Sequence, residues 1–463
     1  MGNFIKKDKI ILLIIWIVFI EFASPQHNYF LLTFIQFIPF FYCIYKDKKN
    51  WLKMAIIFGL SYYIIYYRWL IYPIKYTNFS PYILGPINVF LMAIYQTLYF
   101  VIFTYFFVKL KNFIILSVIW GILEYIKAHI LTGFPWGELS YNLYKAPILI
   151  NIAEIIKSEG ISAFIMLTNL LIFYAIIENN KRKKLIIGTL LLFVVYTLIN
   201  LWILKNTKIR NFNLKIALIQ GNIPEKIKLD EKNNPFVVRE YIRLTKEILP
   251  KKPDLIIWPE AIYLTPFETD NSSIKKIFLN FIKKNNLSII FGSIYTNVNI
   301  KTMNIKVFNS MYFIKNGDVK NFKRYDKIHL VPFGEYTPLK KVLFFINKIV
   351  PGIDYSSGKK TVIFKIKKAK IIPLICYEGI FSDLIKKGIK KGGNLIVNIS
   401  NEAWFGNSSA LYQHIAIDVL KAVEFKKYFI KCANSGISAI ILPTGKILKI
   451  IPPEKRGIIF MKI

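Results

Sequence analysis

The sequence predicts a multi-pass α-helical membrane domain followed by an α/β domain, and three observations support this. Of the 463 residues 54% are hydrophobic, and the mean hydropathy of +0.41 is well above that of an ordinary soluble domain. Long apolar runs fill the first part of the chain. From about residue 214, short apolar runs alternate with amphipathic helical stretches. We therefore expect a transmembrane domain of about seven helices at 1–204 and a second domain at 205–463.

The membrane part is predicted from seven apolar runs. Most are long enough to cross ~30 Å of hydrocarbon as helices, although the first is short unless it extends to Ala23. We read the first run as an uncleaved anchor, because its flank from Glu21 to Pro25 is a poor cleavage site for a signal peptidase. The runs cover residues 10–22, 29–45, 52–72, 83–108, 113–131, 161–177 and 185–204.

The loops between these runs alternate in lysine content. By the positive-inside rule, the N-terminus and the lysine-rich loops are cytoplasmic, and seven crossings place everything after residue 205 outside. The second domain is thus expected to lie outside, which in a bacterium is the periplasmic side of the inner membrane. The rich loops carry Lys6, Lys7 and Lys9, then Lys46, Lys48, Lys49 and Lys53, then Lys109 and Lys111, and finally residues 181–184, whereas the others carry only Lys75, Lys145 and Lys157.

The net charge of +36, from 63 Lys and Arg against 27 Asp and Glu, fits either nucleic acid or anionic lipid. With this hydropathy a membrane surface is the better partner, and no nucleic-acid-binding signature appears. The third outward loop, 132–160, holds the string TGFPWGE from Thr132 to Glu138, followed by Tyr141 and Tyr144. From composition alone this cluster is an ordinary interfacial aromatic belt.

The second domain is predicted from strand-length runs and helical stretches. The turns Asn316-Gly-Asp and Pro443-Thr-Gly-Lys are typical of hairpins. The expected strands are 215–220, 255–258, 288–294, 311–315, 395–399 and 437–442, and the expected helices are 236–249, 274–284 and 411–425.

One further stretch, Lys370 to Phe381, places a cysteine at a strand-to-helix corner, where a thiol can react. Its apolar run predicts a buried strand near a sheet edge, because it contains a proline. Cys376 follows that strand and precedes a helical run from Ile380 to Ile389, so we expect a helix N-terminus to stabilise its thiolate. A lone cysteine here is more often a buried structural residue.

Two other stretches favour the reactive interpretation. Glu260 follows the apolar run in DLIIWPE, and Lys327 and Glu335 lie eight residues apart in RYDKIHLVPFGEYTP, a segment too rich in Pro and Gly for one helix. A carboxylate can accept a thiol proton, an ammonium can stabilise an oxyanion, and a thiolate can attack a carbonyl. Taken singly, each charge is more often a surface residue.

These motifs resemble the carbon-nitrogen hydrolase (nitrilase) superfamily, whose triad is Glu, Lys and Cys in that order. Glu260, Lys327 and Cys376 match those positions. The strings HLVPFGEYTP, LICYE, SNEAWFG and TGFPWGE resemble one branch, the apolipoprotein N-acyltransferases, which are integral membrane enzymes of the bacterial envelope. The resemblance implies a four-layer α-β-β-α sandwich for the second domain.

The resemblance also implies a reaction. Cys376 would take an acyl chain from a phosphatidylethanolamine-like phospholipid as a thioester and pass it to the N-terminal amine of a diacylglyceryl-cysteine apolipoprotein. Glu260 would be the base, Lys327 would hold the oxyanion, and Glu335 would fix the lysine. Tyr377 and Glu378 match positions that shape the pocket. No cofactor or metal is needed, since the thioester carries the acyl group, and we expect a monomer.

Four residues are predicted to contact the lipid. Trp136 and Trp404 lie in the family-like strings. Phe344 and Phe345 lie in the apolar run of Lys340 to Val350, which is bracketed by prolines and flanked by lysines. This run is either a core helix or a lid that lets phospholipid slide laterally to Cys376.

The chain departs from the resembling family at a few places. Leu229 stands where that family usually has tryptophan, lysines replace arginines between Lys421 and Lys431, and the sequence ends at Ile463 before the usual final membrane helix. We expect Cys432 to be a buried core thiol. The four histidines share no metal-ligand spacing, and structural roles for His329 and His414 are at least as probable as catalytic ones.

Two alternative functions remain open from the residues. A membrane-tethered amidase or nitrilase acting on small amides would keep the triad but would have no use for an aromatic outer loop. A non-enzymatic scaffold or transporter would keep the helices but would give no reason for Glu, Lys and Cys at strand ends.

Overall fold

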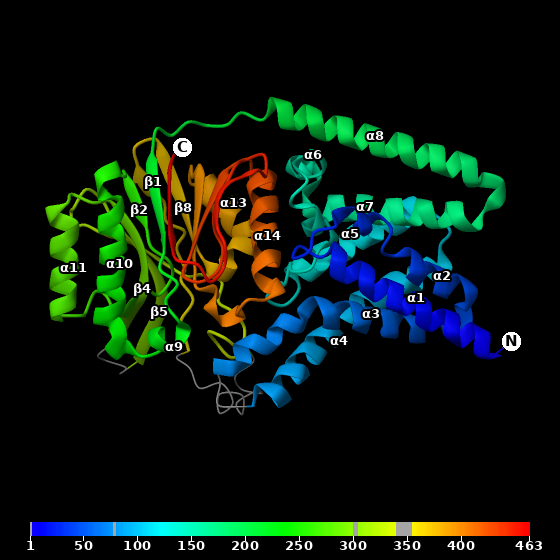
Figure 1. Ribbon diagram of the computed structural model, residues 1–463, viewed down its shortest axis with the longest axis horizontal. Helices are drawn as coiled ribbons and strands as arrows, with labels where there is room; N and C mark the ends of the chain where they lie inside the picture. The colour runs from blue at the N-terminus through cyan, green and yellow to red at the C-terminus, as the bar shows by residue number, and fades with distance from the viewer. Residues whose placement is uncertain (1, 77–79, 300–303, 339–353) are drawn as a thin grey trace.

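The computed structural model describes residues 2–76, 80–299, 304–338 and 354–463. Its helical part and its α/β part lie side by side along the long axis of the molecule (Figure 1). In the α/β part, the strands expected from the sequence form two sheets, and the Pro443 turn joins an antiparallel pair as predicted.

Among the described residues, seven strands form the first sheet. The β1, β2 and β4 strands run parallel, and β4 pairs with β5 in a long antiparallel register from Ile289↔Ile314 to Asn299↔Asn304. Apolar residues on both faces of β1 and β2 explain why these strands are buried. The order is β13 (Gly457–Lys462), β1 (Lys215–Gln220), β2 (Leu255–Ile257), β4 (Ile289–Asn299), β5 (Asn304–Ile314) and β6 (Lys323–Asp326), with β3 (Tyr263–Pro266) beside β4.

In the second sheet, β8 (Ala369–Ile375) lies next to the edge strand β7 (Phe364–Ile366). This agrees with the prediction, made from Pro373, of a strand near a sheet edge. The edge strand β7 pairs with β8 residues only up to Ile371, so Pro373 lies beyond that pairing. The central strands β8, β9 and β10 run parallel. The order is β12 (Ile447–Ile451), β11 (Ser438–Ile441), β10 (Tyr428–Ala433), β9 (Leu395–Ser400), β8 (Ala369–Ile375) and β7 (Phe364–Ile366).

The two sheets pack face to face through a buried core that includes Leu218, Ile257, Ile375 and Val397. Helices α10 (Asn234–Ile248) and α11 (Ser273–Lys284) cover the outer face of the first sheet. Helices α13 (Ser382–Lys390) and α14 (Ser409–Phe425) cover the second (Figure 1). The predicted α-β-β-α sandwich is therefore confirmed.

Four helical stretches in the described residues are long and apolar enough to cross a membrane by length and composition. They correspond to four of the seven predicted runs, and helices α1 (Gly2–Ala23) and α5 (Phe113–His129) cover the first and fifth. The number of crossings stays a prediction. The four stretches are Lys48–Tyr76, with α3 (Trp51–Tyr67); Pro81–Lys109, which is α4; Ala153–Ile177, which is α7; and Asn179–Asn206, with α8 (Arg182–Asn206).

The second predicted run, 29–45, is not one helix. It forms a short 3₁₀ turn at Phe30–Phe34 and then α2 (Ile38–Lys46), which has nine residues. Pro39 explains the break, because proline is accommodated in the first turn of a helix but clashes with the carbonyl four residues before it in a continuous one.

The two parts of the chain share a buried interface on α14. Gln413 accepts a hydrogen bond from Trp136 Nε1 at 2.7 Å and donates one to the Tyr66 carbonyl at 3.0 Å. Asn151 donates to the Thr444 carbonyl at 3.1 Å. One apolar cluster runs from the membrane-part helices into α13 and α14 without interruption. The sandwich is thus packed against the helical part.

Candidate active site

Three candidate residues from the sequence lie at or just past strand ends. Glu260 follows β2, Lys327 follows β6, and Cys376 follows β8. All three are buried, with exposed fractions of 6% for Glu260, 1% for Lys327 and 9% for Cys376. The strands β2 and β6 belong to one sheet and β8 to the other. Lys327 Nζ lies 3.8 Å from Glu260 Oε1, and the charges of both residues act on the Cys376 thiol, so the three residues lie close together.

Lys327 lies between two carboxylates. Its Nζ is 2.8 Å from Glu335 Oε2 and 3.8 Å from Glu260 Oε1. Burial alone would lower the pKa of Lys327, but the charges of Glu335 and Glu260 hold it well above its ordinary value. Lys327 is thus a permanent cation at neutral pH.

Asn309, in the middle of β5, links the same two carboxylates. Its Nδ2 donates to Glu260 Oε1 at 2.7 Å and to Glu335 Oε1 at 2.9 Å, and its backbone carbonyl accepts from the Lys327 N–H at 2.8 Å. The backbone N–H of Asn401 donates to the other oxygen of Glu260 at 2.7 Å. Each Glu260 oxygen is therefore fixed by one short hydrogen bond.

Cys376 is held in a sharp turn between β8 and a short 3₁₀ helix, Cys376–Ile380. Its φ of 52° lies in the left-handed region, which a non-glycine residue occupies only when its surroundings hold it there. Asn398 Nδ2 donates to the Cys376 carbonyl at 3.0 Å. Gly379 makes this approach possible, because a Cβ there would lie 2.3 Å from Asn398 Nδ2.

The expectation of a stabilised thiolate is wrong. Burial and the nearby charge of Glu260 raise the pKa of the Cys376 thiol to about 12, against the opposing effect of Lys327. The helix that starts at Cys376 has five residues, which is too short for a strong terminal dipole to offset the burial. The resting thiol is therefore neutral, and reaction requires a base to remove its proton.

Glu378 joins the segment of Lys327 to the turn of Cys376. One carboxylate oxygen accepts from the N–H groups of Ile328 and His329 at 2.7 and 3.1 Å, and the other accepts from the Ile375 N–H at 2.8 Å. Burial raises the pKa of Glu378 to about 7. Its position explains how two distant stretches of sequence keep Lys327 beside Cys376.

The aromatic candidates have different surroundings. Trp136 is 2% exposed, with its indole N–H bonded to Gln413 and its ring 5.1 Å from that of Trp69. The Tyr377 hydroxyl donates to the Gly133 carbonyl of the same loop at 3.4 Å. Trp404 is partly buried and meets Tyr76 edge to face at 5.0 Å. Phe344 and Phe345, with the proposed lid, lie outside the described residues.

Two lysines of the stretch 421–431, where the resemblance led us to expect arginines, are buried in ion pairs. Lys431 lies 2.8 Å from Glu402 and 2.9 Å from Asp418, and Lys421 lies 2.9 Å from Glu424. Burial would raise the pKa of Glu402, but Lys431 and His414 lower it to about 2. His414, whose Nδ1 is 2.5 Å from Glu402 Oε1, is thus part of a structural network.

The remaining candidates fit structural roles. His329 stacks on Phe381 with ring centroids 3.6 Å apart, and burial lowers its pKa to about 4. Cys432 is a buried free thiol between the sheets, as expected.

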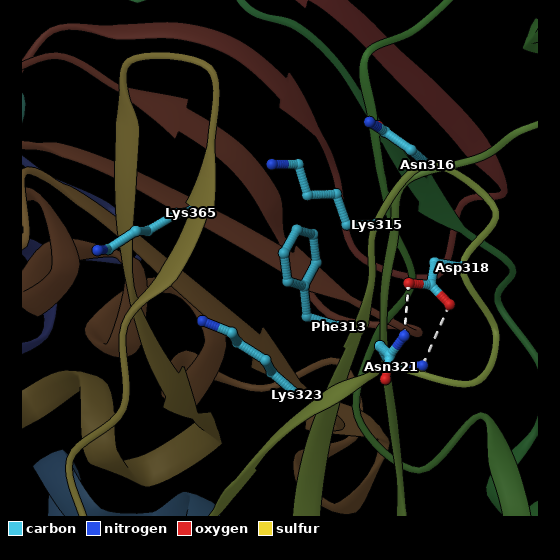
Figure 2. A pocket seen from close by; sticks show the side chains of 7 residues that line it. All are labelled: Phe313, Lys315, Asn316, Asp318, Asn321, Lys323 and Lys365. Atoms are coloured by element: carbon cyan, nitrogen blue, oxygen red, sulfur yellow. Dashed lines mark hydrogen bonds between the residues drawn. The ribbon is translucent and has the colours of Figure 1, made fainter.

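A separate hollow lies at the opposite end of β8 from Cys376, since Lys365 on β7 pairs with Lys370 near the start of β8. Figure 2 shows that Lys315, Lys323 and Lys365 line it around the ring of Phe313, with Asp318 bonded to Asn321. Its position separates it from the candidate site.

Sequence reasoning missed the three asparagines. Asn398 lies within the mostly apolar strand β9 and Asn401 directly follows it, so a buried polar residue in an apolar run was the available signal for these two. Asn309 lies in the more polar strand β5, where no such signal exists.

Two family models match this chain. The model for the apolipoprotein N-acyltransferase N-terminal domain matches residues 18–171, and the carbon-nitrogen hydrolase model matches residues 215–463. The chain is 32% identical to apolipoprotein N-acyltransferase of Geobacter metallireducens, over 94% of this chain and 85% of that protein. It is 35% identical to the Rickettsia typhi enzyme of the same name, over 73% and 67%. Among solved structures, Saccharomyces cerevisiae Nit3 of the nitrilase superfamily shares 19% identity, covering 55% of this chain and 92% of its own, with a TM-score of 0.41.

Proposed function

This chain belongs to the apolipoprotein N-acyltransferase family, and on that premise we propose that it acylates the N-terminal amine of lipoproteins with Cys376 as its nucleophile. The observation that carries the proposal is the meeting of three groups at one buried place. Lys327 lies 3.8 Å from Glu260, and the charges of both act on the Cys376 thiol. A base, a cation and a nucleophile are the groups that acyl transfer requires.

In the first half-reaction, the donor is a membrane phospholipid. Glu260 takes the proton of the Cys376 thiol as sulfur attacks the ester carbonyl carbon. The negative charge that develops on the carbonyl oxygen is held by the Lys327 ammonium and the backbone N–H after Cys376. The ester C–O bond then breaks, the proton passes from Glu260 to the departing oxygen, and a lysophospholipid leaves a thioester on Cys376.

In the second half-reaction, the free amine of the diacylglyceryl-cysteine attacks the thioester carbonyl. Glu260 takes the proton of the amine, Lys327 again holds the oxyanion, and the C–S bond breaks. The proton returns to sulfur and an amide is formed. Glu335 positions Lys327 in both halves, because its carboxylate is 2.8 Å from Nζ.

The family match makes the small-amide hydrolase the weaker candidate. The packing of the helical part against α14 also favours a lipid substrate. Trp136 of the membrane-part loop bonds to Gln413 of α14, and Tyr377, next to Cys376, bonds to the Gly133 carbonyl of the same loop. A soluble amide would need neither contact.

The test supplies purified protein in detergent with phosphatidylethanolamine carrying a labelled acyl chain and a diacylglyceryl lipopeptide. We expect the label on the lipopeptide amine and release of lysophospholipid. Ammonia release from small amides without any lipopeptide acylation would contradict the proposal and support the amidase.

We further propose that residues 1–204 form the membrane domain and that the domain from residue 205 faces the periplasm of a bacterial inner membrane. A membrane-impermeant thiol reagent should label a cysteine introduced at Lys208 in intact spheroplasts. A cysteine at Lys183 should react only after permeabilisation, because the lysine-rich loop it occupies is cytoplasmic. The reverse labelling pattern would place the catalytic domain in the cytoplasm.

A further inference from the structure

A second lysine lies buried beside Glu260. Lys228 ends the short helix α9 (Glu225–Lys228) and is 6% exposed. Its Nζ donates to the backbone carbonyl of Glu260 at 3.3 Å. Lys226, on the same helix, is exposed, so the position of α9 does not by itself bury every lysine on it. A lysine is rarely buried this fully unless its charge is paired or used.

A set of contacts ties this lysine to the carboxylate of Glu260. The Asn401 side chain donates to both oxygens of Glu225 at 3.0 and 2.9 Å. The backbone N–H of the same asparagine donates to Glu260 Oε2 at 2.7 Å. Lys228 therefore holds the backbone of Glu260, and Asn401 holds its side chain. Glu225 accepts hydrogen bonds from Asn401 and attracts the charge of Lys228.

Lys327 is one cation beside two carboxylates. Lys327 is nearer to Glu335, at 2.8 Å, than to Glu260, at 3.8 Å. If Lys327 is matched to Glu335, then Glu260 faces the thiol as an unmatched buried anion. Burial lowers the pKa of Lys228, while the charges of Glu225, Glu260 and Cys376 oppose that effect. These three groups are the charges that act on Lys228.

We infer that Lys228 is a positioning residue for the acyl-transfer reaction, holding Glu260 in place and supplying a second positive charge that faces Cys376. This inference rests on the proposed function. As the proton leaves sulfur, the negative charge stays within the buried site, and Lys228 stabilises it by attraction in surroundings of low dielectric constant. The negative charge of Glu225 in turn partly offsets the positive charge of Lys228.

The first test measures iodoacetamide alkylation of Cys376 against pH in the full-length protein, with the modified peptide quantified by mass spectrometry. Lys228→Met should shift the alkylation profile to higher pH by about one unit, about tenfold slower at a fixed pH, because the thiolate loses a nearby cation. Lys228→Arg should restore most of the rate. Lys226→Met is the matched control on the same helix and should follow wild type.

Glu225→Gln provides the opposite perturbation. The amide keeps an oxygen for Asn401 but removes a negative charge, so the alkylation profile should shift to lower pH. A purely structural role would slow alkylation in both variants or change neither. Overlap of the Lys228→Met profile with wild type would overturn the inference; if that variant does not fold, a Glu225→Gln profile that is unchanged or shifted upward would overturn it.

The second measurement is thioester formation from phospholipid, which should fall in Lys228→Met and recover in Lys228→Arg. Alkylation uses no lipid, so the two failures are distinguishable. If the variants show the expected alkylation profiles but the wild-type protein transfers no acyl chain, the proposed function is wrong. The charge role of Lys228 would still be supported by the alkylation profiles.

Discussion

Cys376→Ala is expected to abolish transfer of the acyl chain from phospholipid to lipopeptide. The proposed pathway has no covalent carrier without this thiol, so neither thioester nor amide product should form. Cys376→Ser should also be inactive, because a serine hydroxyl is harder to deprotonate than a thiol, and Glu260 is the proposed base. Labelled acyl chain on the lipopeptide measures the effect.

Cys432→Ala is the matched control for this substitution. Cys432 is also buried, but its sulfur donates to backbone carbonyls of β1 and β2, including that of Ile257 at 3.3 Å. We expect acyl transfer to persist in this variant. Cys376→Ala protein that melts like wild type yet still acylates the lipopeptide would remove Cys376 from the reaction.

Lys327→Met should slow thioester formation by roughly 10³-fold, the upper range seen when an oxyanion-stabilising group is lost, which corresponds to about 4 kcal/mol of transition-state stabilisation. The methionine keeps the length of the side chain but leaves the developing oxyanion without its cation. Single-turnover thioester formation measures this step separately from transfer to the amine.

Two variants control for folding and for uncompensated charge. Lys323→Met removes an exposed lysine four residues earlier and should react like wild type. Lys327→Met also leaves Glu335 without its partner, which can destabilise the fold. The double variant Lys327→Met with Glu335→Gln removes that buried charge and should regain thermal stability while staying inactive. Recovery of activity in the double variant would contradict the oxyanion role of Lys327.

The sequence predicts much of the sandwich because its strands are short, apolar and bounded by turns. It also places Glu260 and Cys376 just past strands, since each follows an apolar run. The strand before Lys327, with the sequence KRYD, has no apolar run and was not predicted. That these ends meet follows from the packing of two sheets, which local patterns do not encode. The resemblance to a known family supplied that step.

Other features depend on three-dimensional surroundings. The pKa of Cys376 was predicted in the wrong direction, because sequence does not reveal the depth of burial or the five-residue length of the helix after it. Asn309 and Asn401 lie far in sequence from Glu260, which they fix. The second apolar run was read as one helix because its hydropathy outweighed the single proline that divides it.

The raised pKa of Cys376 has a consequence for the mechanism. A thiol that is neutral near pH 7 holds almost no thiolate in the resting site, so in the proposed reaction the proton leaves as sulfur attacks the ester. Glu260 is suited to this task because Asn309 and Asn401 fix its two oxygens at 2.7 Å each. The base role proposed for Glu260 thus has a physical reason in these two hydrogen bonds, in addition to the resemblance from which it was inferred.

The most direct test is mass spectrometry of the purified protein after incubation with a phosphatidylethanolamine of defined acyl chain and no acceptor. We predict an adduct of one acyl chain on the peptide that contains Cys376, removed by neutral hydroxylamine and lost when the lipopeptide is added. An unmodified Cys376 peptide under conditions in which the lipopeptide becomes acylated, or an adduct on another residue that chases into product, would contradict the account.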